Sequence, residues 1–134
     1  TDTTPNYPSG YAVPNVVSVA STDRFDNLSS FSNFGATTVD LGAPGSSILS
    51  TIPGNRYATI SGTSMATPHV AGALAVYWDA NPTMTAAQVI SKLYSSLDPV
   101  AALAGKTVTG GRLNLQKLLA GVPPVPPPPP PPPA

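Results

Sequence analysis

A serine and the only histidine of the chain lie five residues apart in the stretch ISGTSMATPHVAG, residues 60–72. A serine hydroxyl becomes a nucleophile when a neighbouring base, most often histidine, accepts its proton. If these residues form a helix, His69 is rotated by about 140° from Ser64 and displaced by about 7.5 Å along the axis. A general base must come within about 3.2 Å of the proton that it removes. We therefore expect that His69 does not activate Ser64.

Ser64 lies where a β-branched segment gives way to a long apolar one. A hydroxyl at the start of a helix can satisfy free amide groups as an N-cap, which is a structural role. The same position also favours a nucleophile, because free amides and the positive end of the helix dipole stabilise a developing oxyanion. The local sequence leaves both roles open.

The elements around Ser64 are predicted from apolar patterning, turn residues and capping residues. The segment 64–79 is apolar nearly all round, which predicts a helix that is buried on all sides. Thr85 and Gln88 form a capping box, and Asn114 and Gly121 are suited to begin and end a last helix. We expect strands within residues 15–22, 37–45, 46–55 and 56–61, and helices over 64–79, 85–97 and 114–121. Strands followed by helices around a buried central helix predict part of a layered α/β domain.

Composition excludes several function classes. Six Lys and Arg balance six acids, and only 9% of the 134 residues are charged, so no basic surplus indicates a nucleic-acid partner. There is no cysteine, which excludes disulfides and thiolate metal sites. No apolar run reaches eighteen residues, so we expect no membrane span. A surface rich in Ser and Thr is typical of secreted bacterial proteins, and we expect an extracellular location.

The two ends of the chain carry their own predictions. The chain begins TDTTPNYP, without an initiator Met or a signal peptide, which indicates a cut through a longer protein. After Gly121 the sequence becomes almost pure proline, which predicts an extended linker over 122–134 that leads to a further domain. A ligand for a proline-binding module is the alternative interpretation of this segment.

The stretch GTSMATPHVAG resembles the nucleophile motif of the subtilases, the subtilisin-like serine endopeptidases. SSFSNFG, DLGAPG, ILSTIPGNRYATIS and GGRLNLQKLLAG occur in the order and at the approximate spacing of that family, so the resemblance covers residues 7–120. It implies a subtilisin-like layered α/β fold with a mostly parallel sheet, of which residues 1–121 are the C-terminal portion. It also implies polypeptide substrates.

The resemblance implies that Ser64 is the nucleophile and that its amide is one oxyanion donor. Ser61, Gly62 and Thr63 match the segment that lines the substrate cleft, and His69 matches a histidine that is packed and hydrogen-bonded inside the fold. The subtilisin triad, one of the standard reference cases for this chemistry, runs Asp, His, Ser along the chain. No histidine precedes Ser64 here, and the Asn-bearing oxyanion motif is also absent. We therefore expect that these 134 residues alone are inactive.

The resemblance also points to two further sites. The segment Asn6-Tyr7-Pro8 resembles a wall of the primary specificity pocket. Some subtilases bind calcium through carbonyls of the following loop and an acid that matches Asp40, so Asp40 is either a ligand of a structural calcium ion or a carboxylate that is solvated or hydrogen-bonded. The chemistry itself is expected to need no cofactor.

Two other functions compete with this interpretation. An α/β-hydrolase is excluded because it needs an acid and then a histidine after the serine, and only His69 follows Ser64. A non-catalytic binding or scaffold module, built on a subtilase remnant and acting through the proline-rich tail, remains open. The presence of Asp, His and Asn motifs elsewhere in the polypeptide would separate the enzyme from the remnant.

Overall fold

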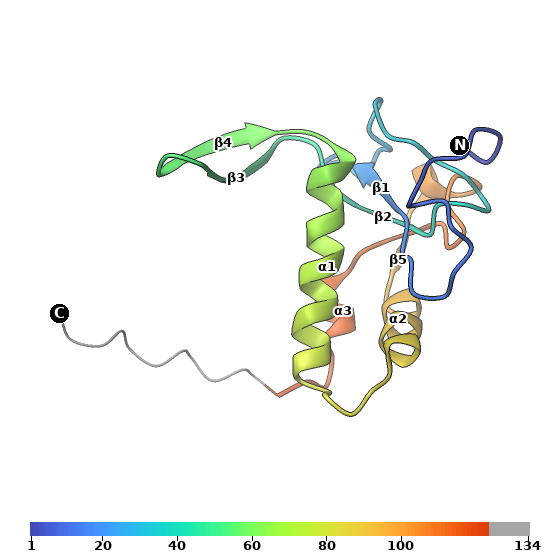
Figure 1. Ribbon diagram of the computed structural model, residues 1–134, viewed down its shortest axis with the longest axis vertical. Coiled ribbons are helices and arrows are strands. Elements are labelled where there is room, and N and C mark those ends of the chain that lie inside the picture. Colours follow the sequence, from blue (N-terminus) through green and yellow to red (C-terminus); the bar gives the residue numbers. More distant parts are fainter. Residues whose placement is uncertain (124–134) are drawn as a thin grey trace.

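The computed structural model describes residues 1–123 (Figure 1). Its main sheet has the strand order β1-β2-β6-β5, formed by Val19–Thr22, Leu41–Pro44, Gly111–Arg112 and Asp98–Pro99. β1, β2 and β6 are parallel, and β5 is antiparallel to β6. The expected α/β class with a mainly parallel sheet is therefore confirmed. The tail predicted over 122–134 lies largely outside the described residues.

The first two strands are short and almost fully buried, as the β-branched sequence of residues 15–22 predicts. Their register pairs Val19 with Leu41 and Thr22 with Pro44. No pattern in the sequence predicted β5, β6 or the 3₁₀ turn at Ala101–Leu103. Two-residue strands are too short for a periodicity to be visible, and only the tertiary pairing defines them.

Helix α1, Thr63–Asp79, packs on β1 and β2 and contacts the other two helices. One of its faces is buried, and it consists of Ala66, Val70, Ala73 and Tyr77 at helical spacing. The prediction of a helix buried on all sides is wrong for this chain. Residues on the remaining surface, among them Ala71, Ala75 and Val76, are exposed, and Trp78 is 40% exposed although its indole N–H donates to the Met84 carbonyl. An exposed apolar surface of this kind indicates a site where another segment packs.

The two later helices begin as predicted. Helix α2, Ala86–Ser95, has the capping box in place, with Thr85 and Gln88 bonded reciprocally. Its residues Val89 and Leu93 are buried in the main core. Helix α3, Leu115–Leu118, is capped by Asn114, whose side chain accepts from the Lys117 amide at 2.9 Å. The chain then turns at Gly121, which has a positive φ of 85° and so favours glycine.

Strands β3, Ile48–Ile52, and β4, Arg56–Ile60, form a separate antiparallel ribbon. The ribbon projects from the body of the molecule and leads directly into α1 (Figure 1). Leu49 and Tyr57 are about two thirds exposed, at 67% and 71%. Both strands were expected from the sequence, but their projection away from the main sheet was not.

A cluster of charged side chains joins β5, β6 and α3. Arg112 donates to Asp26 at 2.8 Å and to Asp98 at 3.0 Å, and Lys117 also pairs with Asp98. Asn114 donates to the same Asp98 carboxylate at 2.8 Å. The bonds from Lys117, Asn114 and Arg112 lower the pKa of Asp98 from 3.8 to about 2. This carboxylate therefore ties the last helix to the edge of the sheet.

Acid should weaken this cluster in a defined window. Because the pKa of Asp98 is lower in the folded chain than in the unfolded chain, its stabilising contribution is present above about pH 4 and is lost as the pH falls towards 2. We expect Asp98→Asn to flatten the pH dependence of the urea midpoint between pH 4 and pH 2. Asp79→Asn is the control, since Asp79 is exposed and makes no ion pair among residues 1–123. An equal flattening in both variants would contradict the assignment.

Candidate active site

Ser64 lies in the first turn of α1, one residue after the helix begins at Thr63. The N-cap is Gly62, which has no side chain, so the role of Ser64 as the N-cap is wrong. Ser64 is exposed, and within residues 1–123 neither its hydroxyl nor its amide makes a hydrogen bond. The amide of a first-turn residue has no partner inside the helix and carries part of the positive end of the helix dipole. The arrangement presents a free hydroxyl beside a free hydrogen-bond donor.

The residues just before Ser64 are held by the segment that follows β2. The Gly62 amide donates to the Gly45 carbonyl at 2.8 Å, and the Ser47 amide donates to the Ser61 hydroxyl at 2.8 Å. A Cβ added to Gly62 would lie at van der Waals distance from the Met65 sulfur, at 3.6 Å, and from the Ser64 amide nitrogen, at 3.7 Å. Because glycine has no side chain, a second backbone can approach this position closely.

His69 lies five residues after Ser64 on the same helix and makes no hydrogen bond with it among the described residues. Its Nδ1–H donates to the Met65 carbonyl at 2.7 Å, one turn earlier in the same helix. The ring is exposed in this chain, so the expectation that it is packed inside is wrong here. It lies on the part of α1 that no described segment covers. The hydrogen bond to Met65 agrees with a structural role.

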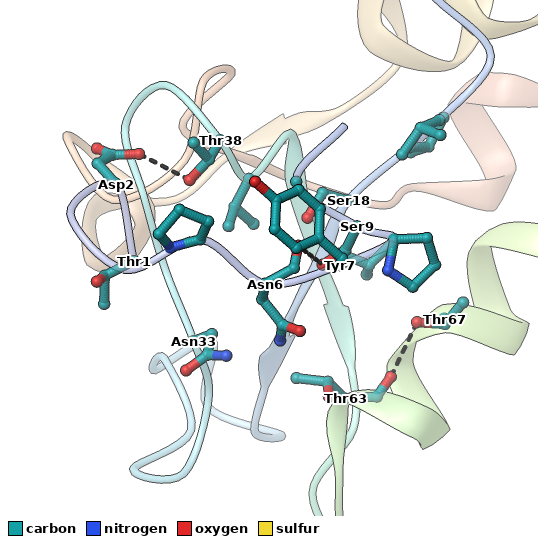
Figure 2. Close-up of a pocket in the computed structure, with 17 residues that line it drawn as sticks. Thr1, Asp2, Asn6, Tyr7, Ser9, Ser18, Asn33, Thr38, Thr63 and Thr67 are labelled. Atoms are coloured by element: carbon teal, nitrogen blue, oxygen red, sulfur yellow. Dashed lines mark hydrogen bonds between the residues drawn. The ribbon is translucent and has the colours of Figure 1, made fainter. Parts of the chain in front are cut away.

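A cavity of about 520 Å³ opens beside the start of α1 (Figure 2). Thr63 and Thr67 lie on one side of it, and Asn6 and Tyr7 of the N-terminal segment lie across from them. Pro8 also lines the cavity. Thr67 donates to the Thr63 carbonyl at 3.0 Å, one helical turn earlier. The fold thus places the Asn6–Pro8 segment and Thr63, the residue that precedes Ser64, in the wall of the same cavity.

Sequence reasoning found only part of this cavity. It named Asn6 to Pro8 and Thr63, but it missed Thr67, Asn33 and the residues Val16–Val19 that lead into β1. Thr67 follows Thr63 by one helical turn, and this spacing could have indicated it. No local sequence pattern predicts the remaining wall of the cavity, because the packing of the sheet assembles it from separate loops.

Asp40 lies away from Ser64, beside a second hollow of about 450 Å³ that is lined by residues 9–14 of the N-terminal loop. One oxygen of its carboxylate accepts from the Ser18 amide at 2.7 Å. Burial, together with the Asp40 charge and hydrogen bond, raises the pKa of Tyr94 to about 12. Among the described residues, no group of three or more acidic or histidine side chains gathers here. The Asp40 carboxylate is therefore hydrogen-bonded, which was one of the two roles expected for it.

Comparisons with known proteins point to a single family. The model of the subtilase family matches residues 1–116. Thermitase from Thermoactinomyces vulgaris is 44% identical over 116 residues, which cover 87% of this chain and 39% of thermitase. Subtilisin BL from Lederbergia lenta is 47% identical over 88 residues, which cover 66% of this chain and 32% of that protein. The chain thus spans about a third to two fifths of the length of these relatives.

Solved structures support the same fold. A chain in the structure of the subtilase cytotoxin SubAB assembly superimposes with a TM-score of 0.75 at 30% identity. The match covers 85% of this chain and 41% of that chain. Within the described residues, no helix is both long and apolar enough to cross a membrane.

The geometry predicts that Ser64 is poorly reactive in the 134-residue chain. An activated phosphonate, which labels activated serines, should react at Ser64 about 10²–10⁴-fold more slowly than with a serine that has a positioned base. His69→Gln should leave the labelling rate unchanged, because the ring bonds to Met65. Rapid labelling that His69→Gln abolishes would show that His69 is the base after all.

Proposed function

The chain belongs to the subtilase family, and on this basis we propose that Ser64 is the nucleophile of a serine endopeptidase that cleaves peptide bonds through an acyl-enzyme. The observation that carries the proposal is the exposed Ser64 hydroxyl beside its own free amide at the start of α1. A free hydroxyl at this place can attack a carbonyl, and the amide can bind the oxyanion that forms. Within residues 1–123, neither the Ser64 hydroxyl nor the Ser64 amide makes a hydrogen bond that the reaction would have to break.

The reaction proceeds in two stages on this geometry. Ser64 Oγ attacks the scissile carbonyl carbon, its proton passes to an imidazole, and the carbonyl oxygen becomes an oxyanion that the Ser64 amide stabilises. The C–N bond then breaks, the imidazolium gives its proton to the leaving amine, and the acyl group stays on Ser64. Water releases the acyl group by the same route in reverse. His69 is engaged with Met65, so the imidazole comes from sequence outside these 134 residues.

The substrate runs past Ser61, Gly62 and Thr63. Gly62 has no side chain, so the backbone of an extended peptide can approach it closely. The cavity beside Thr63 receives the side chain that precedes the scissile bond, and its lining contains one acid, Asp2, which is already bonded to Thr37 and Thr38. Asp2 is the one charged side chain among the described residues of the wall that this chain supplies, and Thr37 and Thr38 already engage its carboxylate, so we expect uncharged side chains to be preferred there.

The uncovered surface of α1 supports the need for a further segment. Ala71, Ala75 and Val76 are apolar and exposed in this chain. A segment that carries the Asp, His and Asn motifs of a subtilase would cover them and bring its imidazole to Ser64. We call the product of refolding this chain with such a segment, either its own or that of thermitase, the assembled domain. An extracellular location is part of the same proposal.

The alternative function is a scaffold module that never forms a complete site. It would use the same fold and would bind partners through the proline-rich segment 122–134. The exposed apolar surface of α1 favours the enzyme, since a scaffold has no reason to keep such a surface bare.

The assembled domain should react with the phosphonate at Ser64 and should hydrolyse an unstructured protein such as casein. Gain of a positioned base predicts labelling about 10²–10⁴-fold faster than in the isolated chain. Ser64→Ala should abolish both activities, whereas Ser50→Ala, an exposed serine on β3, should change neither. An assembled domain that stays unlabelled would favour the scaffold alternative, and labelling of another serine would contradict the role of Ser64.

Calcium should stabilise the fold through Asp40. We propose that its carboxylate and the backbone carbonyls of residues 9–14 hold the ion, whose only role there is structural. Millimolar Ca²⁺ should raise the thermal midpoint of the wild-type assembled domain, since a ligand that binds only the native state stabilises it. Asp40→Asn should remove most of this rise, and Asp79→Asn should retain it. A calcium effect that is equal in both variants would place the ion elsewhere.

A further inference from the structure

The segment Gly45–Ser47 determines where the first turn of α1 lies. It accepts a hydrogen bond from the Gly62 amide through the Gly45 carbonyl and donates one from the Ser47 amide to the Ser61 hydroxyl. Two bonds to consecutive residues fix both the position and the direction of the chain there. Ser64 follows only two residues after Gly62, so a movement of Gly45–Ser47 moves the hydroxyl as well.

A chain of hydroxyl groups anchors Gly45–Ser47 to the sheet. The Ser46 hydroxyl bonds to that of Ser29 at 2.7 Å, and the Ser29 hydroxyl bonds in turn to that of Ser21 at 2.8 Å. Ser21 lies on β1 and is fully buried, and Ser29 is only 6% exposed. The amides of Gly45 and Ser46 also donate to the carbonyl of Thr22, at 2.9 and 3.3 Å. Ser29 is thus the middle link between β1 and the segment that holds Gly62.

The groups around this chain of hydroxyls are tightly packed. A Cβ added to Gly45 would lie 2.3 Å from the Ser21 hydroxyl oxygen and 2.7 Å from the Gly62 carbonyl oxygen. The Ser21 hydroxyl and the Gly62 carbonyl therefore both lie against Gly45. Buried hydroxyl groups that lose their partner either remain unpaired at a cost or draw the backbone into a new position.

We infer that Ser29 is a positioning residue for the reaction, which acts through Ser46 and the Gly45–Gly62 hydrogen bond to hold Ser64 in its attacking position. The inference rests on the proposed role of Ser64 as nucleophile. Ser29 itself does not touch the substrate. Its removal changes the placement of the nucleophile and of the oxyanion-binding amide together, because both belong to Ser64.

Ser32 provides a matched comparison within the same region. It is 8% exposed, it lies three residues from Ser29, and its hydroxyl accepts from the amide of the same strand residue, Ser21, at 2.8 Å. Its other bond goes to the Asn33 carbonyl and does not reach Ser46. Loss of the Ser32 hydroxyl therefore damages β1 without releasing Gly45–Ser47.

The test compares Ser29→Ala, Ser46→Ala, Ser46→Thr and Ser32→Ala in the assembled domain. Two quantities are measured for each: the rate constant of phosphonate labelling at Ser64 per folded molecule, and the hydrogen exchange of the Gly62 and Ser47 amides. Steady-state hydrolysis of a peptide separates kcat from KM. Ser46 is only partly buried, so its variants report on the chain even if Ser29→Ala folds poorly.

We expect Ser29→Ala and Ser46→Ala to lower kcat and the labelling rate constant by about ten- to a hundredfold, since a displacement of about 1 Å costs roughly 10² in rate. KM should change little, and the Gly62 amide should exchange about tenfold faster, as loss of one hydrogen bond predicts. Ser46→Thr keeps the hydroxyl and should retain the wild-type rate. Ser32→Ala should lower the thermal midpoint while its labelling rate per folded molecule stays that of the wild type.

Two results would overturn the inference. If Ser29→Ala and Ser32→Ala lose the same fraction of labelling rate, or if neither changes it, Ser29 has only the structural role of any buried serine. If Gly62 exchange is unchanged in Ser46→Ala, the hydroxyl chain does not hold that residue. A wild-type assembled domain that is not labelled at Ser64 marks the failure of the proposed function instead, and the inference falls with it.

Discussion

The hydrogen bond from the Gly62 amide to the Gly45 carbonyl joins the end of strand β2 to the start of helix α1. It is 2.8 Å long, and its geometry requires that residue 45 have no side chain, because the Ser21 hydroxyl and the Gly62 carbonyl occupy the space that a Cβ would need. The ribbon of β3 and β4 connects these two points in sequence, yet it makes little contact with the core. The position of Ser64 is therefore set by a contact across the fold and not by the chain that leads to it.

The same helix has two faces with different requirements. The face of Ala66, Val70, Ala73 and Tyr77 is buried against the sheet and fixes the direction of α1. The other face is apolar but bare within the part of the chain that the structure describes. This division explains how Ser64 is held in an ordered first turn of α1 while much of the helix surface stays exposed. The place of Ser64 depends on the sheet beneath the helix, whereas the opposite face has no cover among the described residues.

Charge plays a small part near Ser64 and a larger one at the edge of the sheet. The ion pairs of Arg112 and Lys117 with Asp98 hold α3 to β5 and β6. The surroundings of Ser64 are instead organised by neutral hydroxyl and amide groups, including the Ser21–Ser29–Ser46 chain. Neutral groups of this kind fix geometry without adding a net charge, which leaves the helix dipole and the Ser64 amide as the main electrostatic features at Ser64.

The sequence by itself determined the elements whose causes are local. The capping residues Thr85 and Asn114, the apolar run that forms α1, and the motif around Ser64 each act through neighbours a few residues away, so their pattern was sufficient. Geometry along a helix was also enough to separate His69 from Ser64. The two-residue strands β5 and β6, the bare face of α1, the cavity wall at Asn33, and the link from Ser29 to Gly62 came only from the tertiary structure. Each of these arises between residues far apart in the chain, where the packing of the sheet, and not any local propensity, decides which groups meet.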